Sequence, residues 1–422
     1  MNHFKRMSAV LMLALVAVLA MGVMVPVMAQ DAAPVGECGA EGYTGNFKSI
    51  EAVDELTVKF TLCTPDPAFP SKVAFSAFQI APSEHLTATN GGGPELFQNP
   101  VGTGPYKLDT WTQGSEIVMT RNEDYWGDKA LEPTLIFRWN ADSTARLTEL
   151  QAGTADGIDN VGPGDFPVVE GDANLALYTR EGLNVFYLGF NNTVAPFDNV
   201  MVRQAIAYAL DKERIVANFY PPGSSAATQF MPSAIATGFT PEVEPFAVDL
   251  DMAKQLLADS GVALPIEVTL NYRDVVRGYL PTPGVVATDI QAQLAEIGIN
   301  VTIEVMESGS FLDAANAGQL GFYMLGWGAD YPDATNFLDY HFGEGASPQF
   351  GDKFAEITAP LKEAAQLADP AARNAIYVGA NTAIRDLVPM IPIAHGGSAV
   401  AYRAAITGNP HSSPLGNEAF SV

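Results

Sequence analysis

A run of seventeen residues, GWGADYPDATNFLDYHF (326–342), concentrates side chains that could do chemistry. It holds three carboxylates, Asp330, Asp333 and Asp339, among several aromatic residues. A carboxylate beside aromatic faces suits an amine and its apolar neighbours. Two other interpretations are open: an acid–base pair of a hydrolase, or a turn formed by Gly, Pro and Asp. The hydrolase interpretation is weaker, because a spacing of three does not fix the carboxylate separation and no activated Ser or Cys constellation accompanies it.

The segments before this run predict its place in a fold. Apolar residues alternate along 266–272 and 299–305, and the helical stripe between them ends at a glycine. Strand, helix and strand in this order predict a parallel βαβ unit, and the apolar run 322–327 predicts another buried strand. Ligands of open α/β sheets bind beyond the carboxyl ends of the strands. Asp330 lies three residues past such an end, so we predict a binding surface of Asp330, Trp327 and Tyr331.

Two extended segments, 191–199 and 388–397, predict connections between two lobes. The first is polar and precedes a predicted helix, and the second follows two predicted helices. About 390 residues follow the first 29, which is more than one hydrophobic core usually serves. We therefore expect two lobes, and we count Asn191, where the first connection begins, among the candidate ligand-binding residues.

The only two cysteines, Cys38 and Cys63, lie in the N-terminal part of the chain. Alternating residues in this part predict short strands in 47–63, 102–122 and 134–140. In an exported protein the two cysteines favour a disulfide over two free thiols. A metal site is not expected, because two cysteines are too few for a zinc site and the histidines show no paired spacing.

The first 29 residues have the features of a signal peptide: a positive start at Lys5 and Arg6, a long uncharged apolar run and a small-residue site ending at Ala29. An uncleaved membrane anchor is the alternative. The formal net charge of −26 argues against nucleic acid and anionic membranes as partners. We expect an exported protein, periplasmic or at the cell surface.

Five motifs together resemble the extracytoplasmic solute-binding proteins of family 5, the peptide/nickel class that serves ABC importers. They span nearly the whole chain beyond residue 29 and are NFKSIEAVDELTVKFTL (46–62), NPVGTGPYKLDTW (99–111), RNEDYWG (121–127), LGFNNTVAPFDNVMVRQAIAYALDKERIV (188–216) and GWGADYPDATNFL (326–338). The resemblance implies an α/β, periplasmic-binding-protein-like fold of the second type, in which two lobes joined by a hinge close over a ligand. It implies a monomer without cofactor or catalytic residues, which binds a peptide or small zwitterion and delivers it to permease subunits.

The resemblance also implies roles for single residues. In peptide-binding members the aspartate at the position of Asp330 pairs with the α-ammonium of the peptide, and Trp327 and Tyr331 would shape side-chain pockets. Arginines of the cleft can bind the carboxylate, and Arg273 and Arg277 are candidates by their location after strand 266–272. Another solute, such as a sugar or a nickel chelate, is an alternative within the family, and a sensory or interaction protein that has lost transport is an alternative of a different class.

The chain departs from the family pattern at its start, where the first hundred or so residues of the family are not matched. We therefore expect lobe I to be incomplete, through circular permutation, truncation or a minimal form of the fold. The expected organisation is a signal peptide (1–29), a remnant of the small extra domain and lobe I (30–100), lobe I (101–195), lobe II (196–390) and a return to lobe I (391–422).

Overall fold

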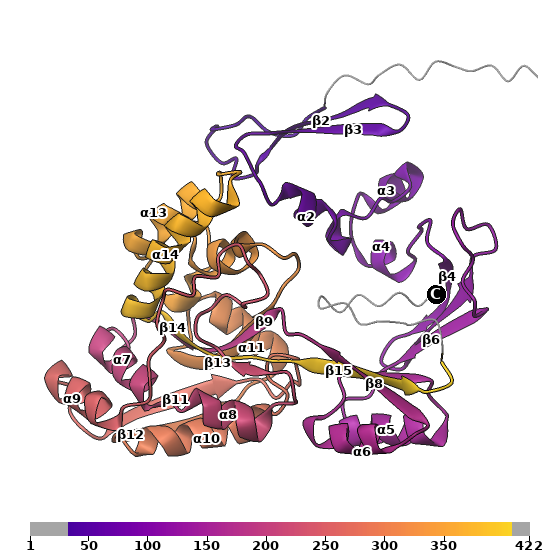
Figure 1. The fold of residues 1–422 in the computed structure, drawn as a ribbon. Coiled ribbons are helices and arrows are strands. Elements are labelled where there is room, and N and C mark those ends of the chain that lie inside the picture. Colours follow the sequence, from indigo (N-terminus) through magenta and orange to yellow (C-terminus); the bar gives the residue numbers. More distant parts are fainter. Residues whose placement is uncertain (1–32, 407–422) are drawn as a thin grey trace, which may run out of the picture. The chain divides into compact units, whose positions relative to one another are not determined.

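The structure is a computed structural model that describes residues 33–406 (Figure 1). The predicted signal peptide lies outside the described residues. The chain divides into two compact units, Met1–Asp66 and Pro67–Val422, and each is considered by itself. Within 33–406, no helix combines the length and the apolar character that a membrane crossing needs.

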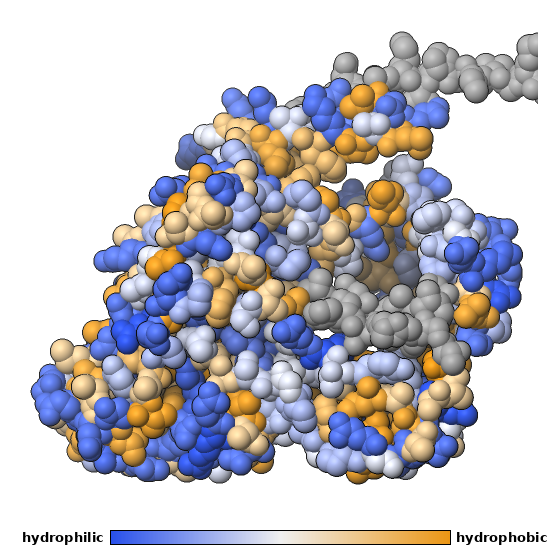
Figure 2. Space-filling view, viewed as in Figure 1, coloured by the Kyte–Doolittle hydropathy of each residue, from blue (hydrophilic) through white to orange (hydrophobic). Residues whose placement is uncertain are grey.

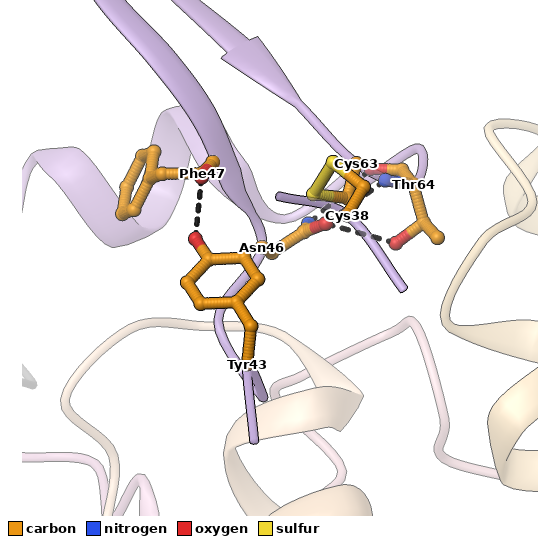
Figure 3. Close-up of a disulfide and its surroundings, with 6 residues drawn as sticks. All are labelled: Cys38, Tyr43, Asn46, Phe47, Cys63 and Thr64. Carbon is orange, nitrogen blue, oxygen red and sulfur yellow. Dashed lines mark hydrogen bonds between the residues drawn. A yellow bond between two sulfur atoms is a disulfide. The ribbon is translucent and has the colours of Figure 1, made fainter. Parts of the chain in front are cut away.

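The first unit is a disulfide-closed hairpin of β2 (Phe47–Asp54) and β3 (Thr57–Leu62), with the two-residue β1 (Ala33–Pro34) on its edge. A disulfide joins Cys38 to Cys63 (Figure 3). The predicted alternation along β3 does not bury its apolar side chains: Val58 is 57% exposed, and apolar residues are visible on the surface of the hairpin (Figure 2). Two strands and a short edge cannot cover both faces of such a ribbon.

Polar contacts close the base of this hairpin. The side-chain oxygen of Asn46 accepts from the backbone N–H and the hydroxyl of Thr64 at 2.9 and 3.0 Å. The Tyr43 hydroxyl donates to the carbonyl of Phe47 (Figure 3). Together with the disulfide, these contacts fix the two ends of the hairpin against each other.

The second unit contains a six-stranded sheet in the order β10-β14-β9-β13-β11-β12. Strands β11 and β12 are parallel, from Ile266 opposite Ile299 to Tyr272 opposite Val305, and helix α10 connects them. The predicted βαβ unit is confirmed. The strands of this sheet are β9 (Asn184–Phe190), β10 (Ser225–Ala226), β11 (Ile266–Tyr272), β12 (Ile299–Val305), β13 (Phe322–Gly328) and β14 (Met390–His395).

Helices cover both faces of this sheet (Figure 1). Along β9, Phe186 and Leu188 face one apolar core, and Val185 and Tyr187 face the other. Burial on both faces explains why β9 and β13 are continuous apolar runs. The helices on the first face are α7 (Val200–Ala209), α8 (Lys212–Phe219), α9 (Leu250–Ser260) and α10 (Pro283–Ala295); those on the second are α11 (Ser308–Asn316), α13 (Ala355–Ala364) and α14 (Pro370–Leu387).

Two three-stranded sheets complete the second unit. Helices α5 (Ser143–Ala152) and α6 (Phe166–Gly171) share a small apolar core with β7-β15-β8, whereas no residue of β4, β5 or β6 is buried. The strands of these two sheets are β4 (Tyr106–Thr112), β5 (Glu116–Arg121), β6 (Thr134–Arg138), β7 (Gly157–Asp159), β8 (Leu175–Arg180) and β15 (Ser398–Arg403). Short helices of the same unit include α2 (Phe69–Val73), α3 (Ser83–Thr89), α4 (Pro94–Gln98) and α12 (Tyr340–Phe342). The incompleteness of lobe I stays a prediction.

Of the two predicted connections, 388–397 contains an observed crossing, whereas the other crossing precedes the predicted segment 191–199. The chain passes from β8 to β9 at 181–183 and from β14 to β15 at 396–397, and these two crossings join the large sheet to β7-β15-β8 (Figure 1). Strand β9 pairs with β13 and β14, so it belongs with the residues we assigned to lobe II. The polar segment 191–199 follows β9 and stays with this sheet, where the Asn191 amide donates to the Gly318 carbonyl at 2.6 Å.

The two crossings are in direct contact. The amide of Asn184 donates to the Gly396 carbonyl at 2.7 Å and accepts from its N–H at 2.8 Å, across 212 positions of sequence. A Cβ on Gly182 would lie 2.2 Å from the same carbonyl oxygen, which no other residue type can accommodate without a shift. The close approach of the two backbones therefore requires glycine at this position.

Candidate functional site

A cavity of about 590 Å³ lies in the second unit where the crossing 181–183 and Ser398 meet the carboxyl end of β13. Such a volume is typical of sites for small molecules. The residues around it include Asp330, Trp327, Tyr340, Arg273, Arg277 and Glu181. A second cavity of about 30 Å³, beside α14 and β14, is mainly apolar and has room for little more than water.

Asp330 follows the end of β13 at the cavity, as the crevice rule for α/β sheets predicts. Its backbone N–H donates to Asn336 Oδ1 at 2.9 Å, and Asn336 Nδ2 donates to its carboxylate at 3.3 Å. Within residues 33–406, no lysine, arginine or histidine forms an ion pair with Asp330. The carboxylate is therefore positioned by neutral groups, without a counter-charge among the described residues.

Arg273 and Arg277 reach the same cavity from the loop between β11 and α10. Arg273 donates to the Ser308 hydroxyl at 3.0 Å and to the Tyr279 hydroxyl at 3.2 Å, and Arg277 donates to the Val276 carbonyl at 3.0 Å. In the described part of the chain, neither guanidinium has a carboxylate within ion-pair distance. Both cations are thus held by neutral partners.

The other charges of the cavity are Arg180 and Glu181, at the end of β8 and the start of the first crossing. The Arg180 side chain is only 7% exposed and pairs with Asp159. Glu181 is exposed and forms no ion pair with any described residue. The cavity therefore carries two cations and two carboxylates without protein counter-charges.

Tyr279 fixes the arginine loop against the sheet. Its ring lies directly over Gly326 of β13, where a Cβ would come within 2.3 Å of the ring. Its carbonyl accepts from the Tyr220 hydroxyl at 2.8 Å. A larger residue at 326 would push the loop away, so this glycine permits the arginines and Asp330 to share one cavity.

Trp327 stacks on Tyr340 at the wall of the cavity, with ring centroids 4.3 Å apart. We predicted Trp327 as an aromatic wall residue; Tyr340, from the same sequence run, joins it. Tyr331 is not among the residues around the cavity; its hydroxyl lies 3.3 Å from the Thr335 hydroxyl. Asn191 is not among them either, since its 3% exposed side chain is bonded within segment 191–199 and to Gly318.

Asp333 has a different environment from Asp330. Its two oxygens accept from the two terminal nitrogens of Arg373 at 2.8 Å each, and one also accepts from the Thr335 N–H at 2.9 Å. Burial alone would raise the pKa of Asp333, but these hydrogen bonds outweigh it and lower the pKa. Asp333 is therefore a buried structural ion pair, which removes the second carboxylate that an acid–base mechanism at this loop would need.

Asp339 ends a short π-helix, η3 (Thr335–Asp339), that follows Asp333. One of its oxygens is buried without a hydrogen-bond partner among the described residues. Burial, together with the nearby charge of Asp333, raises its pKa to about 7. Burial lowers the pKa of the adjacent His341 to about 3, and its Nδ1 donates to the Phe337 carbonyl at 2.7 Å, so this imidazole is neutral.

Several residues of the site were missed by the sequence analysis. Glu181 lies on a crossing that we placed elsewhere, and Asn184 begins the strand that follows it. Asn336 lies in the run 326–342 among more conspicuous carboxylates. Only Tyr340 had a usable signal, because it is aromatic and lies in the same run. The arrangement as a whole presents opposite charges around an aromatic wall.

Comparisons with known proteins identify the family of this chain. Residues 27–349 match the model of the bacterial extracellular solute-binding proteins, family 5 Middle. Heme-binding protein A of Haemophilus influenzae is 32% identical over 89% of this chain and 69% of its own length. Di/tripeptide-binding protein 1 of Pseudomonas aeruginosa is 32% identical over 84% of this chain and 67% of its own length.

A solved structure resembles the fold closely. The ABC transporter-associated periplasmic binding protein of Helicobacter pylori, in complex with the peptide STSA, superposes with a TM-score of 0.78. It is 29% identical in sequence, and the match covers 88% of this chain and 72% of that protein. The family match extends over more than half of the chain, from its N-terminal region to beyond Asp330. The chain therefore belongs to the bacterial extracellular solute-binding proteins of family 5.

Proposed function

We propose that this protein is the substrate-binding component of an ABC importer, which captures short peptides or similar zwitterions outside the cytoplasm and delivers them to the permease. One observation carries the proposal: Asp330, Arg273 and Arg277 surround one cavity, and no described residue neutralises them. Charges at a cavity wall that lack protein partners are stabilised by a ligand of opposite charge.

Each group has a role in this proposal. Asp330 pairs with the α-ammonium of the peptide, and Arg273 or Arg277 binds its carboxylate, for which a guanidinium has a matching fork of donors. Trp327 and Tyr340 contact an apolar side chain next to the ammonium. The Pseudomonas relative is named a di/tripeptide-binding protein and the Helicobacter structure contains a bound peptide, and both support this class of ligand.

Closure of the cavity would take place at the two crossings, 181–183 and 396–397. Both are short: the first lines the cavity, the second leads into Ser398 at the cavity, and the two approach each other closely at Gly182 and the Gly396 carbonyl. Hinges are typically a few residues at the ends of elements that absorb a backbone change. The closed monomer is then the form that the permease recognises, at the periplasmic or cell-surface side of the membrane.

The experiment that tests the proposal compares one dipeptide in three forms: free, N-acetylated and C-amidated. Ligand that binds only the folded protein stabilises it by about 2.7 kcal/mol at a hundredfold excess over the dissociation constant. We expect a clear increase in melting temperature with the free dipeptide, and weaker binding in calorimetry when either terminus is blocked. Equal affinity for all three forms contradicts a zwitterion site.

Haemin is a useful additional probe, because one relative is named a heme-binding protein. Binding of haemin with no binding of any peptide would replace the peptide proposal. Mass spectrometry of small molecules that co-purify with the protein provides a check that does not depend on the choice of probe.

A further inference from the structure

Asn336 connects the two parts of the cavity wall that the proposed function uses. It lies in the π-helix η3 and is only 4% exposed. Its Oδ1 accepts from the backbone N–H of Asp330 at 2.9 Å and from the indole N–H of Trp327 at 3.2 Å. Its Nδ2 donates to Asp330 Oδ2 at 3.3 Å. One amide therefore contacts both the carboxylate and the aromatic wall residue.

The chemistry of the partners fixes the orientation of this amide. A backbone N–H and an indole N–H can only donate, so the atom that faces both must be the amide oxygen. The NH₂ group then faces the Asp330 carboxylate, which can only accept. Neither contact would survive a rotation of the amide by half a turn, so the amide holds Asp330 and Trp327 in one relative position.

The choice of an amide also holds Asp330 without a counter-charge. Asp333, three residues away, is held by the guanidinium of Arg373, which neutralises it. Asn336 supplies a hydrogen bond without a counter-charge, and no described residue donates to Oδ1 of Asp330. A carboxylate held in this way is oriented but remains available to a cation in the cavity.

We infer that Asn336 is a positioning residue that makes the site selective for ligands with a free amino group, by holding the Asp330 carboxylate in place without neutralising it. This inference rests on the proposed function, because it assigns the ligand ammonium to Asp330. The turn that carries Asn336 is itself anchored, since Asp333 accepts from the N–H and hydroxyl of Thr335 while it binds Arg373.

The test is the ratio of affinities for a free and an N-acetylated dipeptide, measured in the wild type and in Asn336→Ala. Removing a hydrogen bond to a charged group costs about tenfold to a hundredfold in an equilibrium. We expect affinity for the free dipeptide to fall by that factor and affinity for the acetylated one to stay nearly constant, so that the ratio falls accordingly.

Asn192→Ala is the matched control. The Asn192 amide likewise accepts one hydrogen bond and donates another, both with the backbone of Asp352, but it does not border the cavity. It should leave the affinity ratio unchanged. If Asn336→Ala does not fold, Asn336→Ser serves instead, since its shorter side chain cannot reach both Asp330 and Trp327 and should give the same direction of change.

A measurement without ligand separates this inference from the proposed function. The indole N–H resonance of Trp327, assigned by its loss in Trp327→Phe, should move in Asn336→Ala and stay in place in Asn192→Ala. If wild-type protein does not distinguish free from acetylated dipeptide, the proposed function fails, and the selectivity assigned to Asn336 fails with it. If the wild type distinguishes them and Asn336→Ala keeps the same ratio, or weakens both ligands equally, only the inference is overturned.

Discussion

Asp330 and Asp333 lie three residues apart in one loop, yet the structure gives them opposite tasks. Asp333 is 7% exposed and forms a bidentate pair with Arg373, whereas Asp330 borders a cavity and is held by an amide. The first carboxylate is neutralised by its own protein and the second is not. Both residues are aspartates of the same loop, so neither residue type nor position in the sequence distinguishes them. The role of each carboxylate therefore depends on the partner that the fold brings to it.

The largest expected effect is on stability and tests the Asp333 half of this comparison. Asp333→Ala leaves the Arg373 guanidinium buried without its partner, which typically costs about 3–5 kcal/mol. Urea denaturation followed by circular dichroism should show a loss of this size. Asp330→Ala in the same assay should change stability by less than about 1 kcal/mol, and the reverse order would show that we assigned the two roles wrongly.

The second prediction concerns affinity and tests the Asp330 half. Asp330→Ala should weaken binding of a free dipeptide by about a hundredfold to a thousandfold, because it leaves the ligand ammonium in the cavity without a counter-charge. Acetylation of the dipeptide should reproduce most of this loss in the wild type, and the two changes should not add. Calorimetry on the four combinations measures the coupling.

Glu181→Gln is the matched control for that prediction, since it also removes one uncompensated carboxylate from the cavity wall. It should cost less than about tenfold, because an exposed carboxylate contributes little to an ion pair. A larger loss of affinity in Glu181→Gln than in Asp330→Ala would show that the ligand ammonium binds at Glu181, on the crossing 181–183.

The third prediction uses pH to examine the remaining carboxylate of the loop. The pKa of Asp339 in the folded state is raised to about 7, in the neighbourhood of Asp333, Arg373, Lys72 and Tyr377. Because the folded state binds the proton of Asp339 more tightly than the unfolded state does, Asp339 adds to the free energy of unfolding at low pH. This stabilisation is complete below pH 3.8 and is lost as the pH rises through 7. Between pH 5.5 and 7.5 the loss amounts to about 2 kcal/mol.

Asp339→Asn removes this titration. The difference in unfolding free energy between variant and wild type should shift in favour of the variant by about 2 kcal/mol from pH 5.5 to 7.5. Taking the difference cancels the opposite contribution of His341, whose pKa is lowered to about 3. A difference that is constant with pH would mean that Asp339 is ionised over the whole range.

The smallest expected effect comes from the aromatic wall. Tyr340 is 53% exposed and stacks on Trp327 at 4.3 Å. Tyr340→Ala should lower stability by about 1 kcal/mol, the typical value of an aromatic pair, and weaken a dipeptide with an apolar first residue by severalfold. A dipeptide that begins with glycine should be nearly unaffected, which makes it the control ligand.

Local patterns predicted much of lobe II. The strand periods at 266–272 and 299–305 and the helix between them are visible in a single stretch of sequence, and the structure contains them at nearly the same bounds. The position of Asp330 at the end of β13 followed from the same local reasoning. These features depend on neighbours in sequence, which is why the sequence was sufficient for them.

Features that depend on distant partners could not be predicted in this way. Arg373 is 40 residues from Asp333, and nothing in either segment indicates the pairing. The crossing was misplaced because polar residues at 191–199 suggested a linker, whereas the real crossing at 181–183 is too short to produce a compositional signal. The same polar residues instead bond to Gly318 and Asp352 of their own lobe.

The contact between the two crossings has a consequence for protein engineering. All six strands of the large sheet come from the continuous segment 184–395, and the two ends of that segment touch, with His395 Nδ1 donating to the Asn184 carbonyl at 2.6 Å. A segment with adjacent ends can be excised or transplanted without reconnecting the chain inside it. Residues 184–395 thus form a natural cassette, which can be exchanged between relatives, or inserted into a reporter protein, by cutting the gene at two places only.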